Sequence, residues 1–177
     1  MSETKQLTAY LAGPDVFRKD ALEFFAERKK LCLQHGIQGL SPFDNEDNFG
    51  DELFSKAHST HVFMGNHNII GLCDIIIANL IPFRGACVDD GTAWELGCGY
   101  AKNKLLYGYT PFIKYNLPSI TEISTLWLNI RNTEYPKIES FGNNTVNLML
   151  QESIELSGGK IFSTFEECLI NIKNRFK

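Results

Sequence analysis

The stretch CDIIIANLI at residues 73–81 constrains the fold more strongly than any other part of the sequence. It is rich in β-branched residues and apolar on both faces, as expected of a central strand buried on both sides of a parallel sheet. Parallel neighbours need crossover connections, and helical patterns alternate with short apolar runs along the rest of the chain. The sequence therefore predicts a parallel sheet with right-handed crossovers.

The other elements follow from apolar periodicity and from glycine and proline positions. Further strands are expected at 7–12, 37–41, 104–109 and, as a short edge strand, 160–162. Helices are expected at 18–35, 55–72, 92–103, 143–155 and 164–176, the last capped by Ser163 or Thr164, with a short helix at 119–130. We expect one α/β domain over residues 1–177, a parallel five-stranded sheet flanked by helices, flavodoxin-like in style.

Composition narrows the function class. The net charge of -4 argues against a nucleic-acid surface, for which basic stripes are expected. No apolar stretch approaches the roughly 20 residues of a membrane helix, and the start MSETKQLTAY does not resemble a signal peptide. The five cysteines form no CxxC pair and fit reduced thiols, with Cys73 and Cys98 expected to be buried. We therefore expect a cytoplasmic protein that binds neither nucleic acid nor membrane.

Ligands of open parallel sheets bind beyond the carboxyl ends of the strands. In this chain the loops at that edge are 13–18, 42–50, 80–91 and 110–118, and three of them carry carboxylates, in the segments AGPD, SPFDNE and PFRGACVDDGTAWE. Such a gathering suits a site that needs a nucleophile, a proton donor or acceptors for hydroxyl groups.

Glu95 is the main candidate for chemistry, and it also has a structural explanation. It is expected in the first turn of the helix at 92–103, where Thr92-x-x-Glu95 has the spacing of a capping box. From spacing alone the structural interpretation is favoured. The helix N-terminus should also lower the pKa of the Glu95 carboxyl and keep it ionised, which suits a nucleophile better than a general acid.

Four segments carry a family resemblance when taken together. They are AYLAGPDVF near the start, SPFDNE after the second strand, CDIIIANLIPFRG with DDGTAWELGCGYAKNK, and FGNNTVNLML near the end. In this order and spacing they resemble the nucleoside 2-deoxyribosyltransferase family. The resemblance implies exchange of the base of 2'-deoxyribonucleosides with free nucleobases in nucleoside salvage, without a cofactor or a metal.

The resemblance also assigns roles to single residues. Glu95 matches the nucleophile that attacks the anomeric carbon and forms a covalent deoxyribosyl-enzyme. Asp89 matches the acid that holds the sugar hydroxyls and helps to protonate the departing base, and Tyr10 matches a tyrosine that steadies the nucleophile. Asn147 matches an asparagine lent by a neighbouring subunit, which implies a homo-oligomer.

At the residues that contact the base, this sequence matches the family only in part. Phe17 and Glu46 fall where the family contacts the base, whereas Asn66 stands where several members have a base-binding aspartate. Asp90 adds a second acid beside Asp89, which leaves open which of the two takes the acid's role.

Arg84 and Gly91 complete the predicted substrate-binding set. Arg84 has two interpretations, a phosphate contact or loop ordering through Asp89 or Asp90. Gly91 is interpreted as a turn residue, because no GxGxxG or GKS/T pattern is present. His58 and His61 lie three residues apart without an evident third ligand, so no metal site is predicted.

Two other functions remain as alternatives. A hydrolase of 2'-deoxynucleosides or of their 5'-monophosphates would share the fold, the nucleophile and the first half-reaction. A nucleoside-sensing module without enzymatic activity is the more distant alternative, since fold alone does not fix function.

Overall fold

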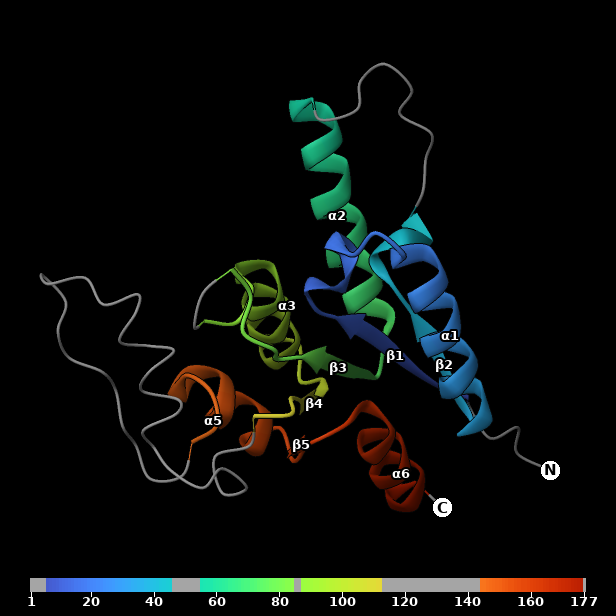
Figure 1. Cartoon of the computed structure of the whole chain (residues 1–177), viewed down its shortest axis with the longest axis vertical. Helices are drawn as coiled ribbons and strands as arrows, with labels where there is room; N and C mark the ends of the chain where they lie inside the picture. The colour runs from blue at the N-terminus through green and yellow to red at the C-terminus, as the bar shows by residue number, and fades with distance from the viewer. Residues whose placement is uncertain (1–5, 46–54, 85–86, 113–143, 177) are drawn as a thin grey trace, which may run out of the picture.

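The computed structural model of the chain describes residues 6–45, 55–84, 87–112 and 144–176, which Figure 1 shows as coloured ribbons. The helix expected at 119–130 lies outside these residues. Within them the strands are β1 Leu7–Ala12, β2 Ile37–Leu40, β3 Ile75–Asn79, β4 Leu105–Tyr109 and β5 Ile161–Phe162. They form one sheet in the order β2-β1-β3-β4-β5, and every neighbouring pair is parallel. The predicted α/β class and five-stranded parallel sheet are therefore confirmed, with the short β5 at an edge.

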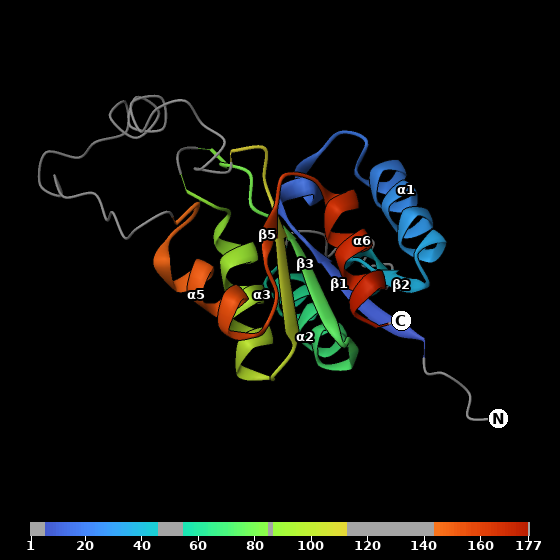
Figure 2. The same cartoon turned by 90° about the horizontal axis from the view of Figure 1, so that it is seen from below.

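Helices cover both faces of this sheet (Figure 2). On one face lie α1 Ala21–Gln34 and α6 Phe165–Arg175; on the other lie α2 Lys56–Leu72, α3 Asp90–Ala101 and α5 Leu148–Leu156. The core is divided accordingly, because Ile75 and Ile77 of β3 pack with residues of α1 and α6, while Ile76 and Ala78 pack with residues of α2, α3 and α5. All five residues of β3 are buried, as the sequence predicted for a central strand.

Three helices begin elsewhere than expected. Helix α1 begins at Ala21 rather than 18, because the backbone at Arg18 is extended, and side-chain caps explain the shifts of the other two. Helix α3 begins at Asp90 rather than Thr92, because the Asp89 side chain accepts a hydrogen bond from the backbone N–H of Thr92. Helix α5 begins at Leu148 rather than 143, after Asn147 accepts from the N–H of Met149. A carboxylate or amide at the cap position satisfies a free N–H of the first turn and so sets where the helix starts.

The crossover between β1 and β3 positions the ligand-binding edge. The chain runs from β1 to β2 on one side and then returns to β3 on the other, so the connections diverge at this point, where ligands of such sheets bind. After β1 the chain passes over the end of β3 through Gly13, whose φ is 149°. A Cβ at Gly13 would lie 2.7 Å from the Cβ of Asn79, so this passage requires glycine.

The start of α6 gives a first prediction. Replacing Thr164 with alanine should lower the free energy of unfolding by about 1 kcal/mol, because it removes one half of a capping box. Thr164 Oγ1 accepts from the N–H of Glu167 at 3.2 Å, and the Glu167 carboxylate accepts from the N–H of Thr164. Urea denaturation measures the change. Ser163→Ala is the control, because Ser163 contributes its backbone N–H to Glu167; equal losses in both variants would contradict the assignment.

The structure also bears on two further predictions, which concern membrane-spanning helices and the burial of cysteines. No helix among the described residues is both long and apolar enough to cross a bilayer. All five cysteines are free, and Cys73 is buried as expected, whereas Cys98 is only half-buried.

Candidate active site

A buried pair of side chains, Tyr10 and Glu95, lies at the carboxyl half of the sheet. Tyr10 comes from β1 and is fully buried; Glu95 comes from α3 and is 9% exposed. The Tyr10 hydroxyl donates a hydrogen bond of 2.5 Å to Glu95 Oε1. The structure thus brings together two of the three residues predicted to be catalytic.

The electrostatics of this pair differ from the expectation. Burial raises the pKa of Glu95 to about 7; the hydrogen bond from Tyr10 opposes this rise, and the charge of Asp89 adds to it. Burial, with the charge of Glu95 and the hydrogen bond to it, also places the pKa of Tyr10 well above its ordinary value, so Tyr10 stays the donor. The predicted lowering of the Glu95 pKa by the helix terminus is wrong, because Glu95 lies in the second turn of α3, where desolvation dominates.

This raised pKa makes stability depend on pH. The folded protein holds the Glu95 proton more tightly than the unfolded chain does. The protonated carboxyl therefore stabilises the fold fully below about pH 4.5, and this stabilisation is lost as the pH rises through about 7. Between pH 4.5 and pH 8 the wild type should lose up to about 3 kcal/mol of unfolding free energy relative to Glu95→Gln, since each pKa unit corresponds to about 1.4 kcal/mol. Urea denaturation of both proteins across this range measures the difference, and parallel pH curves would contradict it.

Asp89 is the third residue predicted to be catalytic, and in this structure it is the N-cap of α3. Its Oδ2 accepts hydrogen bonds from the N–H and the hydroxyl of Thr92, at 2.9 and 3.0 Å. The capping box expected between Thr92 and Glu95 is therefore wrong, because Asp89 takes the cap position. Gly91 lies in the first turn of α3 rather than in a preceding turn, and a Cβ there would crowd Asp89 Oδ2 at 3.1 Å.

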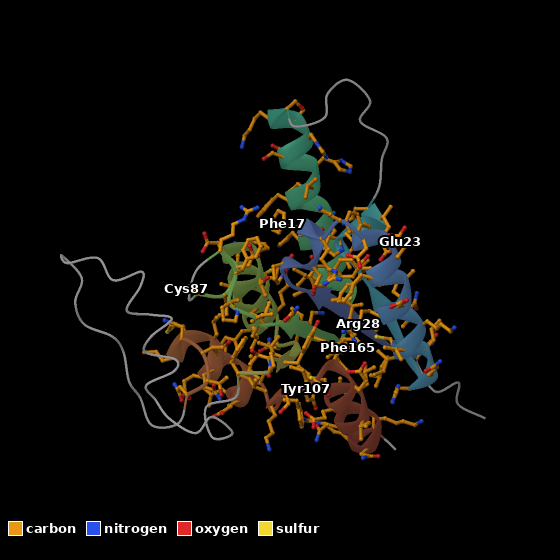
Figure 3. All side chains as sticks on the ribbon, in the orientation of Figure 1. Phe17, Glu23, Arg28, Cys87, Tyr107 and Phe165 are labelled. Carbon is orange, nitrogen blue, oxygen red and sulfur yellow. The ribbon has the colours of Figure 1, made fainter. Side chains whose placement is uncertain are left out.

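An aromatic pair lies beyond the ends of β1 and β3. Phe17, labelled in Figure 3, stacks on Phe83 with ring centroids 5.1 Å apart, and remains 57% exposed. The Arg84 guanidinium carbon lies over both rings, 5.0 Å from Phe17 and 4.7 Å from Phe83. Within the described residues Arg84 forms no ion pair with Asp89 or Asp90, so the predicted loop ordering through these acids is not what holds it.

The remaining predicted residues form hydrogen bonds with other partners or lie outside the described residues. Asn66 Oδ1, on α2, accepts a hydrogen bond of 3.4 Å from Asn45 Nδ2. Asn147 is exposed as the N-cap of α5, with its side chain bonded to the N–H of Met149 at 2.9 Å. Glu46 lies outside the described residues, so its predicted contact with the base stays a prediction.

Sequence reasoning missed a second polar pair, Asp15 and Asn79. Asn79 Nδ2 donates to Asp15 Oδ2 at 2.9 Å, and both side chains are buried. They border a cavity of about 380 Å³ lined by Pro14, Asp15, Phe17, Arg18, Phe24, Arg28, Asn79, Ile81 and Phe83. The available signal was Asn79 itself, a carboxamide at the end of an otherwise apolar strand, since a buried polar group needs a partner.

His58 and His61 are metal ligands by residue type. Within the described ranges no group of three or more His, Cys, Asp or Glu side chains is placed to hold a metal ion. The chemistry that these residues offer is a buried carboxylate with a phenol donor, a capping carboxylate beside it, and aromatic rings.

Comparison with known proteins adds to this geometry. The family described as nucleoside 2-deoxyribosyltransferase matches residues 9–149. The structure is similar to a 2-deoxyribosyltransferase from Leishmania mexicana, with 28% identity, a TM-score of 0.66, and coverage of 95% of this chain and 97% of that one. A conserved protein from Enterococcus faecalis shares the fold, with 23% identity, a TM-score of 0.66, and coverage of 96% and 99%.

A fungal relative matches part of the chain. An uncharacterized protein of Schizosaccharomyces pombe is 39% identical over 102 residues, which are 57% of this chain. The match spans 48% of the fungal protein, or about half of its length.

Proposed function

Because the chain belongs to the nucleoside 2-deoxyribosyltransferase family, we propose that it transfers 2-deoxyribose between nucleobases through a covalent bond to Glu95. The observation that carries this proposal is the buried hydrogen bond between Tyr10 and Glu95 at the edge where β1 and β3 diverge. Among the described residues Glu95 has one hydrogen-bond donor; a buried carboxylate with so little compensation is costly as structure alone, and it suits a nucleophile.

In the first half-reaction a Glu95 oxygen attacks the anomeric carbon of a 2'-deoxyribonucleoside. A C–O bond forms to the sugar as the C–N bond to the base breaks, and the bonding pair leaves with the base. The base takes up a proton that comes from water and is relayed by Asp89, one oxygen of which has no hydrogen-bond donor in the described part of the chain and so can carry it. A 2-deoxyribose lacks the electron-withdrawing 2-hydroxyl group, so positive charge develops more easily on the sugar in this step.

In the second half-reaction a ring nitrogen of the incoming base attacks the same carbon. The new C–N bond forms, the bond to Glu95 breaks, and the nitrogen loses its proton. Two inversions give net retention, as in retaining glycosidases. The incoming base must arrive before water does, and the burial of Glu95 supports such exclusion.

Tyr10 and burial act on the nucleophile in opposite directions. Removal from water raises the pKa of Glu95 to about 7 and makes the carboxylate a stronger base, while the Tyr10 hydroxyl stabilises its ionised form. The result is a carboxylate that is partly ionised near neutral pH and poorly solvated, which favours attack on carbon.

We further propose a homo-oligomer in which Asn147 completes the sugar site of a neighbouring subunit. The exposure of Asn147 and of Met149 beside it supports this arrangement. The role we propose is nucleoside salvage in the cytoplasm, and five free cysteines fit a reducing compartment.

The test is chromatography of purified protein with 2'-deoxyinosine, with and without free adenine. A deoxyadenosine peak that depends on adenine is the expected result. Hypoxanthine released at one rate with or without adenine would mean that water is the acceptor, and the hydrolase would replace the transferase. Binding without turnover would favour the sensing module.

A further inference from the structure

Thr92 is a buried polar residue of α3 to which the proposed chemistry gives no role. It is 1% exposed and stands in the sequence three residues after Asp89 and three before Glu95. Residues three apart are neighbours on a helix, so Thr92 lies beside both carboxylates. Burial raises the pKa of Glu95 most and the charge of Asp89 raises it further, which indicates that the two carboxyl groups lie within electrostatic range of each other.

The Thr92 hydroxyl is not needed to cap the helix. The cap bond is made by the backbone N–H of Thr92, which donates to Asp89 Oδ2 at 2.9 Å, and any residue at this position could supply that N–H. A threonine hydroxyl inside a helix commonly donates to a backbone carbonyl of the preceding turn. Here it donates instead to the same Asp89 Oδ2, at 3.0 Å. The second bond therefore has a purpose other than capping.

Two donors on one oxygen fix the orientation of the whole Asp89 carboxylate. A carboxylate held by one donor can still turn about its Cβ–Cγ bond, because that torsion is soft, whereas a second donor restricts the turn. Gly91 borders the same oxygen, since a Cβ there would lie 3.1 Å from Asp89 Oδ2. With Oδ2 held in this way the position of Oδ1 is set, and Oδ1 accepts no hydrogen bond from any described residue.

We propose that Thr92 is a positioning residue for the proton transfer to the departing base, because its hydroxyl holds Asp89 Oδ2 and so directs Asp89 Oδ1 toward the base. As the C–N bond breaks, its electron pair leaves with the base and Glu95 binds the sugar. A proton from water passes through Asp89 Oδ1 to the base, and the incoming base returns a proton to water in the second half-reaction. Thr92 itself gains and loses no proton. This inference rests on the proposed function, because it explains how Asp89 is held for that reaction.

Thr92→Val tests this role with little change of shape, since valine keeps the branched side chain and the N–H that caps the helix. The measurement is the release of hypoxanthine in the first turnover at saturating 2'-deoxyinosine. The rate should fall about tenfold to a hundredfold, the loss expected for a displaced catalytic group. The half-saturating concentration should change by less than about twofold, because the proton transfer belongs to the transition state. Thr92→Ser keeps the hydroxyl and should restore the rate to within about threefold of the wild type.

Thr8→Val is the matched control, because the chain repeats the same contacts at the opposite end of the sheet. The N–H and the hydroxyl of Thr8 both donate to Asp74 Oδ2, at 3.0 and 2.9 Å. Thr8→Val should lower the urea midpoint at least as much as Thr92→Val, since Thr8 Oγ1 also accepts from the N–H of Asp74 at 3.1 Å. It should leave the first turnover unchanged. Equal slowing in the two variants would show that the rate only follows stability, and would overturn the inference.

A double-mutant cycle shows whether Thr92 acts through Asp89. Asp89→Asn keeps a side chain that caps the helix but has no carboxylate to relay a proton. In that background Thr92→Val should slow the first turnover by less than about twofold, because no relay is left to position. The same loss in both backgrounds would place Thr92 outside the relay and would overturn the inference.

Failure of this inference and failure of the proposed function have different signatures. If Thr92→Val released hypoxanthine as fast as the wild type while the wild type still exchanged bases, only the inference would be wrong. If the wild type released hypoxanthine at one rate with or without adenine, the transferase would be wrong. The expected effect of Thr92→Val would then still apply, because the hydrolase shares the first half-reaction. A wild type that released no hypoxanthine would overturn both.

Discussion

Replacing Glu95 with alanine is expected to abolish base exchange, lowering the rate by at least about 10⁴-fold, as removal of a nucleophile does in other covalent enzymes. Without the carboxylate no covalent intermediate forms, and the remaining groups supply only binding and proton transfer. Glu95→Gln should be as inactive, because the amide keeps the acceptor for Tyr10 but is not a nucleophile.

The measurement is the initial rate of deoxyadenosine formation from 2'-deoxyinosine and adenine, with circular dichroism to verify the fold. Intact-protein mass spectrometry should show a deoxyribosyl adduct on the wild type and none on Glu95→Ala. Glu23→Ala, at an acid exposed on α1 and labelled in Figure 3, serves as the control with unchanged rate. Activity close to that of the wild type in Glu95→Ala would remove Glu95 from the mechanism.

Replacing Tyr10 with phenylalanine should have the second largest effect, a loss of about 100-fold in kcat, by analogy with removal of one charge-stabilising donor elsewhere. The change leaves the ring in the core but deletes the hydrogen bond that favours ionised Glu95. The pKa of Glu95 should then rise above about 7, so the rising limb of the pH–rate profile moves to higher pH.

The profile of kcat/KM between pH 5 and pH 9 separates this role from a structural one. Tyr107→Phe is the matched control, since Tyr107 is equally buried in the sheet but donates to Asn171 on the other face. That variant should keep the wild-type profile. A Tyr10→Phe enzyme that is slower but has an unmoved rising limb would argue that Tyr10 only packs.

The fold could be predicted from the sequence because its strongest signals are local. The apolar run that forms β3 predicts a strand buried on both faces, and the alternation of strands with helices along the chain predicts a parallel sheet. The helix ends were predicted less well. Asp89 and Asn147 were predicted to act in the chemistry, although both residue types also favour the cap position that they take in the structure.

The site was less predictable because its contacts join distant parts of the chain. The roles of Tyr10 and Glu95 came from the family resemblance, and their spacing gives no hint that they touch. The direction of the Glu95 pKa shift was wrong because a helix position is visible in sequence, whereas desolvation by packed neighbours is not. Asp15 and Asn79 are 64 residues apart, and their contact follows only from the register of β1 with β3.

The hydrogen bond between Tyr10 and Glu95 has a kinetic consequence, because it closes a loop of 85 residues. Contacts of such separation form slowly, since the ordering entropy of the intervening chain must be overcome first. Local helix formation in α3 places Glu95 on a turn but leaves it fully hydrated, with an ordinary carboxylate's acidity. Enzymatic activity during refolding should therefore return only when α3 docks on β1, later than the far-ultraviolet signal of its helices.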